Sequence, residues 1–325
     1  MQRKPKTSTT DRKSTTDGPK KSVNAPVETS KLFSLFFYSV LRKPVSVSIN
    51  AKIGFYLCLL AGGSIITDFI KVPPTYFSYK YNILNILFAK WAWGWTIIPL
   101  TLFIIISSFI YTAGSKSMMQ GHLMRVLIGS TLWYICTNSF REIERLTGHC
   151  SSMSSNKTKV AEMRKAFLNQ SICRKNGGTW LGFDISGHCF LMILCNLWIM
   201  EELRVLLHWN ILGSYLNCNE TESDSKITPK ELKHTQNNFN RHSNLLRWLF
   251  CFLSCLSVMW DFILFTTVLY YHNMPTKVLG GLTAIICHLL CYRFLCPLGK
   301  SGDFFGFFPG LPGDGKFNFV QRRSS

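Results

Sequence analysis

Residues 180–202 read WLGFDISGHCFLMILCNLWIMEE, and this stretch decides the predicted fold. It begins with a polar, glycine-containing turn that ends in His188, continues as an uncharged run of helical length, and closes on Glu201 and Glu202. A long apolar run with polar ends is typical of a helix that crosses a membrane. A histidine at such a boundary can meet both water and lipid, and a second one, His272, ends the next long apolar run.

Apolar residues are gathered into blocks along most of the chain. The 325 residues are 47% hydrophobic and only 16% charged, whereas soluble domains have about 25% charged residues. A bilayer core is spanned by about 20 apolar residues. We therefore predict an all-α, polytopic membrane protein with about six transmembrane helices. These spans are expected at residues 53–72, 91–112, 123–140, 188–207, 245–271 and 278–295.

The segments outside these blocks complete the predicted organisation. Residues 1–30 are rich in Lys, Ser, Thr and Pro, which predicts a disordered cytosolic tail. Residues 31–52 hold an apolar cluster between basic residues, which fits an interfacial amphipathic segment or an entry turn packed against the bundle. The six-span membrane domain is expected over residues 53–298, with a solvent loop at 217–244, and residues 299–325 form a second cytosolic tail.

The formal net charge is +19, and much of the basic excess lies in the tails and loops around the apolar blocks. Basic residues in such positions orient the spans and attract anionic lipid headgroups, so the charge does not indicate nucleic-acid binding. Six spans place both tails on one side, and the basic N-terminal tail puts that side in the cytosol. Residues 141–187 then face the lumen or exterior, which suits the glycosylation sequons at Asn156 and Asn169. Cys150 and Cys173 lie in the same segment and either pair as a disulfide in that oxidising compartment or stay free.

Two histidines are expected to reach the same membrane face. His188 opens the fourth span and His272 closes the fifth, and successive spans run in opposite directions. Two imidazoles at one level can divide phosphoryl transfer, one attacking phosphorus and the other protonating the leaving oxygen. The alternative is that each is an interfacial residue without a catalytic duty. The Ser186-Gly187 turn would let backbone N–H groups approach an anion, or Ser186 or Asp184 could simply cap the helix.

Other polar residues have open interpretations. Arg141 and Lys277 lie at the level of the histidines, where they could bind phosphate oxygens or remain solvated loop charges. Asp261 falls deep in the fifth span and is expected to line a polar cavity or to pair with a neighbouring helix. No Cys and His spacing typical of a metal site occurs, so we expect neither a metal nor another cofactor.

The run GGTWLGFDISGH at residues 177–188 and the run TTVLYYH at residues 266–272, followed by Lys277 and Gly280, resemble the fat storage-inducing transmembrane proteins. The resemblance covers roughly residues 30–300. It implies a multi-pass protein of the endoplasmic reticulum membrane with both termini in the cytosol. It also implies a core similar to that of the lipid phosphate phosphatases.

The resemblance also implies an activity. In the related phosphatases a Ser-Gly-His histidine is the general acid and a later histidine forms a phospho-enzyme, which assigns the acid role to His188 and the nucleophile role to His272. The implied reaction splits fatty acyl-CoA into acyl 4'-phosphopantetheine and adenosine 3',5'-bisphosphate, and it supports lipid-droplet formation and membrane homeostasis. The alternative is a non-enzymatic protein that binds triacylglycerol and diacylglycerol and partitions them into droplets. The chain departs from the phosphatases in having no carboxylate shortly after His272.

Overall fold

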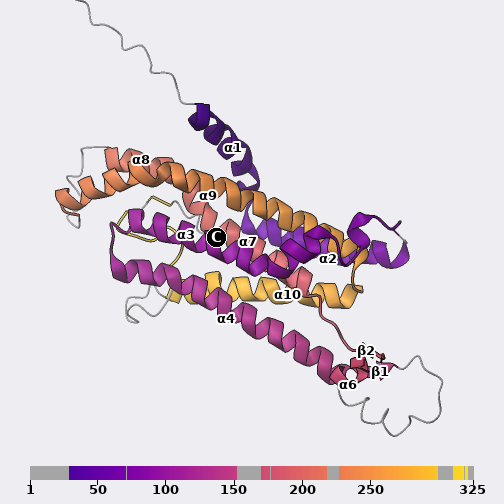
Figure 1. Ribbon diagram of the computed structural model, residues 1–325. Helices are drawn as coiled ribbons and strands as arrows, with labels where there is room; N and C mark the ends of the chain where they lie inside the picture. Colours follow the sequence, from indigo (N-terminus) through magenta and orange to yellow (C-terminus); the bar gives the residue numbers. More distant parts are fainter. Residues whose placement is uncertain are drawn as a thin grey trace, which may run out of the picture.

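The computed structural model describes residues 29–70, 72–151, 170–175, 177–217, 227–298, 310–317 and 319–320. This part of the chain is mostly helical (Figure 1). The long helices are α1 (Thr29–Ser46), α2 (Ile49–Phe69), α3 (Ala92–Tyr111), α4 (Lys116–Thr147), α7 (Gly187–Leu207), α9 (Pro229–Tyr270) and α10 (Met274–Leu289). The shorter elements are α6 (Gln170–Lys175), α8 (Trp209–Asn217), α11 (Cys296–Leu298), β1 (His149–Ser151) and β2 (Thr179–Leu181). Almost all of the predicted N-terminal tail, with Asn156 and Asn169, lies outside the described residues.

The predicted class of an all-α polytopic membrane protein is confirmed. Four helical segments within the described residues are long and apolar enough to cross a membrane: Ile49–Phe69, Leu84–Tyr111, Pro229–Tyr270 and Met274–Leu298. They coincide with the predicted first, second, fifth and sixth spans. The third and fourth predicted spans also form helices, α4 and α7, which are not among these four segments; α7 carries Glu201, Glu202 and Arg204 toward its end.

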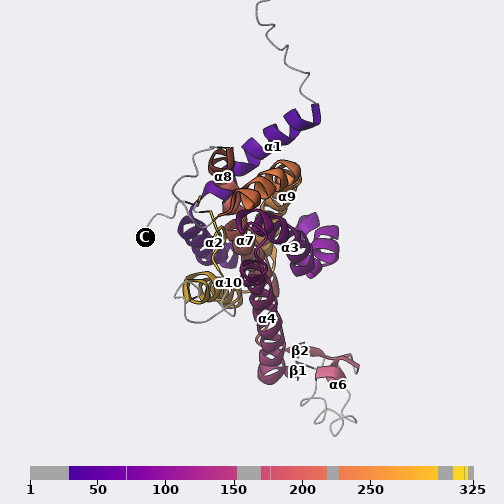
Figure 2. The same ribbon diagram turned by 90° about the vertical axis from the view of Figure 1, so that its left-hand side faces the viewer.

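α7 lies at the centre of the bundle. Figure 2 looks along the bundle and shows α2, α3, α9, α10 and α4 arranged around it, and it packs most extensively against α9 and α10. Every residue from Met192 to Met200 is buried, so this helix is enclosed on all sides. α2, by contrast, exposes Phe55, Ile65 and Ile66. Large exposed apolar side chains on an outer helix are suited to lipid rather than water.

Asp261 of α9 joins three helices in the middle of the bundle. Its carboxylate forms a salt bridge with Lys52 and accepts hydrogen bonds from the Tyr56 hydroxyl of α2 at 2.8 Å and from Asn196 Nδ2 of α7 at 2.7 Å. Of the two interpretations from sequence, pairing with neighbouring helices is therefore the one that the structure supports. A carboxylate at this depth is stabilised because it has both a counter-charge and hydrogen-bond donors.

Two helices, α2 and α9, begin earlier than the sequence pattern suggested, and local capping explains both starts. The segment expected at 31–52 contains nearly all of α1 and also the start of α2, because Ser48 caps α2 by accepting a hydrogen bond from Ala51 N. Part of the solvent loop expected at 217–244 is helical, because α9 begins at Pro229. There, Thr228 and Glu231 form a reciprocal capping box with proline in the first turn, a known helix-start signal.

Residues 310–317 and 319–320, here called the C-terminal segment, return to the bundle instead of forming a separate tail. The buried Arg125 of α4 forms a bidentate salt bridge with Glu202 of α7, at 2.6 and 2.8 Å, and also donates to the carbonyl of Gly310. Phe317 and Phe319 of the segment are buried in the hydrophobic core. Glu202 is thus a buried partner of both Arg125 and Tyr292.

Candidate active site at the histidine end

The Ser-Gly-His turn is fixed where α7 begins. The Ser186 hydroxyl caps this helix by accepting a hydrogen bond from Cys189 N at 3.4 Å, and the Ser186 amide donates to the carbonyl of Thr276 in α10 at 3.2 Å. Gly280 makes this approach possible, because a Cβ there would lie 2.5 Å from the Ser186 carbonyl oxygen. The expectation that Ser186 could cap the helix is therefore confirmed, and His188 is held in the first turn.

The segment before this turn is fixed by the end of α4 and by a disulfide. Cys150 and Cys173 are bonded, so of the two alternatives left open by the sequence the disulfide is the one that forms, and β1 pairs antiparallel with β2. Trp180 Nε1 donates to the carbonyl of Glu144, while the Phe183 amide donates to the Thr147 hydroxyl at 2.9 Å. These contacts place residue 184 beside the turn between α9 and α10.

His272 lies in that turn with an unusual backbone. Its φ is 59°, in the left-handed region that residues other than glycine rarely adopt. The conformation is supported by the preceding residue, since the Tyr271 amide donates to the Thr267 carbonyl and the Tyr271 hydroxyl donates to the Phe77 carbonyl at 2.8 Å. Such backbone strain is concentrated at functional sites, because it costs energy that packing must offset.

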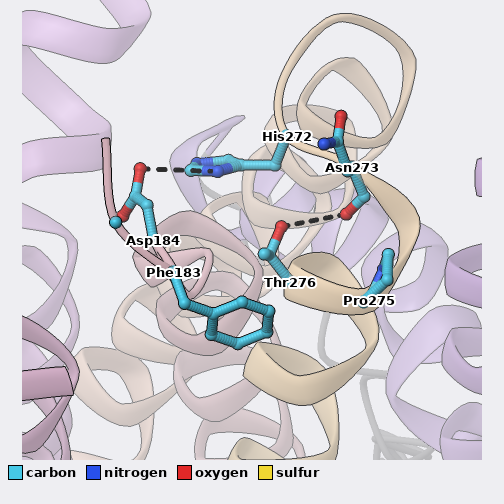
Figure 3. Close-up of a pocket in the computed structure, with 7 residues that line it drawn as sticks. Phe183, Asp184, His272, Asn273, Pro275 and Thr276 are labelled. Carbon is cyan, nitrogen blue, oxygen red and sulfur yellow. Dashed lines mark hydrogen bonds and ion pairs between the residues drawn. The ribbon is translucent and has the colours of Figure 1, made fainter. Parts of the chain in front are cut away.

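Asp184 and His272 face each other. Asp184 Oδ2 lies 3.7 Å from His272 Nδ1, and Figure 3 shows the two side chains pointing toward one another. The exposed fraction is 62% for Asp184 and 21% for His272. The sequence showed no carboxylate shortly after His272, but the fold supplies one from a segment far earlier in the chain.

Opposing effects act on the imidazole of His272. Burial lowers the pKa of His272 below its ordinary value, the Asp184 carboxylate acts to raise it, and the charges of Lys277 and Lys80 add to the lowering. The net direction is downward, so His272 is neutral at pH 7. A neutral imidazole has the free lone pair that a nucleophile needs.

A pocket of about 270 Å³ opens beside this pair. Figure 3 shows Asp184, His272 and their neighbours around it. Its lining residues are Gly182, Phe183, Asp184, His272, Asn273, Pro275 and Thr276. His188 is half-buried and is not among them, but it lies close enough for its charge to interact with those of His272 and Asp184. The structure therefore brings the two predicted histidines and Asp184 together.

The remaining predicted site residues have different positions. Gly187 is the first residue of α7, and beyond its chain neighbours and its own helix backbone no atom lies within 4 Å of the place its Cβ would occupy, so a ligand can approach the backbone there. Lys277 is buried and donates to the Val268 carbonyl at 2.8 Å, so its charge affects the site without lining the pocket. Arg141 is exposed on α4, donates to Asn138 of the same helix, and does not line the pocket either.

Two basic residues near the histidines were missed from the sequence. Lys80 interacts electrostatically with His272, and Lys90 does so with His188. Both are exposed and lie in the connection between α2 and α3. The order of the predicted spans could have indicated them, because it places this connection on the same membrane face as the end of α9. Among the described residues no three His, Cys, Asp or Glu side chains cluster as metal ligands would.

The fold and this pocket together define a polytopic helical membrane protein whose polar, histidine-containing site lies at one end of the bundle. The sequence profile of the family described as fat storage-inducing transmembrane protein matches residues 73–292, a range that contains both histidines. The chain belongs to this family.

Several curated relatives carry one name, acyl-coenzyme A diphosphatase FITM2. The protein from Drosophila melanogaster is 30% identical over 308 residues, which is 91% of this chain and 69% of that protein. The proteins from Homo sapiens and Danio rerio are both 32% identical, covering 78% and 73% of this chain and 82% and 81% of their own lengths. No solved structure matches the chain.

Proposed function

We propose that this protein is an acyl-CoA diphosphatase, a hydrolase that splits fatty acyl-CoA into acyl 4'-phosphopantetheine and adenosine 3',5'-bisphosphate. The name shared by the relatives supports the substrate and the reaction class. The observation that carries the proposal for this chain is the contact between His272 and Asp184 in a polar pocket, with His188 close by. A proton held on Nδ1 by Asp184 leaves the lone pair of His272 Nε2 free to attack phosphorus.

The reaction then proceeds in two displacements. His272 Nε2 attacks one phosphorus of the diphosphate, forming a P–N bond as the bond to the bridging oxygen breaks, and His188 donates a proton to that leaving oxygen. A water molecule, deprotonated by His188, next attacks the phosphoryl group and breaks the P–N bond. His272 returns to its initial state, and water supplies the oxygen that the second product gains. No metal or cofactor takes part in either step.

The polar groups around the histidines have supporting roles. Lys80 and Lys90 are positioned to balance the negative charge of the diphosphate, as basic residues do around transferring phosphoryl groups. The turn at Ser186 and Gly187 offers backbone N–H groups at a helix start, where anions bind favourably. Arg141 and Lys277 are assigned no direct contact with substrate.

The proposed location is the endoplasmic reticulum membrane, with both termini in the cytosol and the histidine end facing the lumen. The disulfide between Cys150 and Cys173 supports this orientation, because disulfides persist in oxidising compartments. α1 supports it at the other end, where exposed Leu and Phe side chains beside Arg42 and Lys43 suit an interfacial helix. The domain arrangement that follows has six membrane-spanning helices within residues 49–298, namely α2, α3, α4, α7, α9 and α10, with the C-terminal segment packed against them. Lipid-droplet formation is the cellular process that we assign to this activity.

A second candidate function is non-enzymatic binding of triacylglycerol and diacylglycerol. The exposed apolar faces of the outer helices would support contact with neutral lipid. The pocket at the histidine end favours the enzymatic proposal instead, because its Asp184 and His272 are suited to a charged headgroup rather than to an uncharged glyceride.

The test compares His188→Ala and His272→Ala with the unchanged protein, each purified and supplied with oleoyl-CoA. We expect release of adenosine 3',5'-bisphosphate to fall by at least about 100-fold in both variants, as for loss of a general acid or a nucleophile. His234→Ala is the matched control, because His234 is exposed near the start of α9 at the other end of the bundle. Undiminished release from both variants would refute the mechanism, and binding of labelled triacylglycerol measured in parallel separates the two functions.

A further inference from the structure

A second and larger cavity, about 1220 Å³, lies at the opposite end of the bundle. Its walls come from the junction of α1 and α2, the last turns of α7, the start of α8, the π-helical turn at Leu290–Leu295 after α10, and the C-terminal segment. His188 and Arg204, both on α7, are 16 positions apart, which is about 24 Å at a rise of 1.5 Å per residue. This cavity is therefore separate from the pocket that contains His272.

Three arginines from three different elements line the cavity. Arg42 comes from α1, Arg204 from α7 and Arg293 from the π-helical turn. Arg42 uses one nitrogen to donate to the carbonyl of Leu207 at 2.8 Å, which fixes the position of its guanidinium group. Positions so distant in sequence converge only through the tertiary fold, and guanidinium groups are the side chains best suited to bind phosphate in a bidentate way.

The lining carries a clear excess of positive charge. Against three arginines it has one carboxylate, Glu201, so these side chains sum to +3 − 1 = +2. Glu201 is itself engaged, since its Oε1 lies 3.4 Å from Nε2 of the buried His288. A phosphomonoester carries a charge of about −1.5 to −2 at pH 7 and would balance this excess, whereas a zwitterionic headgroup would not.

Part of the lining is apolar. Ile49, Val205, Leu207, Ile211 and Leu311 contribute hydrocarbon surface next to the arginines. A free inorganic anion would contact only the arginines, whereas a ligand with both a phosphate and a hydrocarbon part would contact the arginines and the apolar side chains. α1, which supplies Arg42, also exposes Leu32, Phe33 and Phe36 closer to its start, outside the cavity lining.

We propose that this cavity binds the phosphomonoester group of an acyl-bearing amphiphile. The arginines hold the phosphate, the apolar wall contacts the adjoining hydrocarbon, and the C-terminal segment closes one side. Two sources carry this chemistry: a membrane glycerolipid that ends in a phosphomonoester, and an acyl-CoA through its ribose 3'-phosphate. The proposal does not depend on hydrolysis at the histidine end.

The test measures binding to the full-length His272→Ala protein in detergent, so that no ligand is hydrolysed. The probes are dioctanoyl phosphatidic acid, dioctanoyl phosphatidylcholine, palmitoyl-CoA and palmitoyl-(3'-dephospho)-CoA. We expect phosphatidic acid to bind at least about 10-fold more tightly than phosphatidylcholine, as charge-assisted hydrogen bonds to arginine predict. Tighter binding of palmitoyl-CoA than of its dephospho form would assign the acyl-CoA as a source, and equal binding of the two would restrict the source to the membrane lipid.

Variants then locate the site. Arg204→Gln and Arg293→Gln should each weaken binding of phosphatidic acid about 10-fold, whereas Glu201→Gln should strengthen it by raising the lining charge to +3. Arg241→Gln, an exposed change on α9 outside the cavity, should leave affinity unchanged. Arg293 is exposed, so its variant tests the site even if the half-buried Arg204 proves necessary for folding. Equal affinity for the two glycerolipids, or full affinity in Arg293→Gln, would overturn the proposal. Because oleoyl-CoA hydrolysis by Arg293→Gln is assayed separately, failure here is distinct from failure of the diphosphatase assignment.

Discussion

Replacing Asp184 with Asn tests how the tertiary structure activates His272. The change keeps the size and the hydrogen-bonding oxygen of the side chain but removes its charge. Asp184 Oδ2 lies 3.7 Å from His272 Nδ1, and the carboxylate is 62% exposed, so a water-like dielectric applies. At that distance the Coulomb energy between unit charges is about 1 kcal/mol in water. Loss of this stabilisation of a positively charged, phosphorylated imidazole should lower kcat/KM about 5- to 10-fold.

The same substitution should move the pH profile in a defined direction. Burial already holds the pKa of His272 below its ordinary value, and the Asp184 carboxylate acts to raise it. Without that carboxylate the pKa falls further. The neutral, nucleophilic form then persists to lower pH, so the acidic limb of kcat/KM should shift to lower pH even as the plateau falls.

The assay is release of adenosine 3',5'-bisphosphate from oleoyl-CoA over a range of pH, with Asp68→Asn as the matched control. Asp68 is an exposed carboxylate near the end of α2, at the same end of the bundle, and it does not contact His272. If Asp184 only repels the anionic substrate, Asp184→Asn would raise kcat/KM by lowering KM. That result, or an unchanged acidic limb, would refute the argument that Asp184 acts on His272.

Three further predictions concern a close backbone contact, a buried ion pair and the disulfide. Gly280→Ala should lower both the midpoint of thermal unfolding and kcat, because its Cβ would lie 2.5 Å from a backbone oxygen of the Ser-Gly-His turn. Gly62→Ala is the control, because a Cβ there has open space and should change neither quantity. Thermal unfolding and the rate of oleoyl-CoA hydrolysis are the two measurements. Arg125→Ala should destabilise the fold by about 3–5 kcal/mol by leaving Glu202 buried and unpaired, and the denaturant midpoint should largely recover when Glu202 is also changed to Leu. Cys150→Ser should cost about 2–4 kcal/mol and increase proteolysis near β1 and β2, measured by limited digestion under oxidising conditions.

The predicted boundaries show where sequence patterns are informative. Blocks of apolar residues located the main helices because a bilayer core requires about 20 such residues in succession. The start of α9 was placed too late because its first turns are polar, and the decisive signal there was the capping pair Thr228 and Glu231. The C-terminal segment was predicted to be a tail because it is rich in glycine and proline, although two of its phenylalanines, Phe317 and Phe319, are buried in the core.

Some features of the candidate site could likewise be predicted from the sequence, and others could not. The turn at Ser186 and the positions of His188 and His272 at span ends followed from the sequence, because antiparallel neighbours bring such ends together. The partner of His272 did not follow, since Asp184 reaches it only after Trp180 and Phe183 are bonded to the end of α4. Neither did the burial of Lys277, whose ammonium group turns toward the Val268 carbonyl.

The sequence by itself determined that this chain is helical, that it spans a membrane, and that two histidines lie at one face, because these properties depend on local hydrophobicity and on the direction of successive spans. Only the tertiary structure decided which charges meet: Asp184 with His272, Asp261 with Lys52, Arg125 with Glu202, and three arginines around one cavity. The physical reason is that a charge within a bundle is stable only where a distant segment supplies its partner, and that pairing depends on the packing of whole helices.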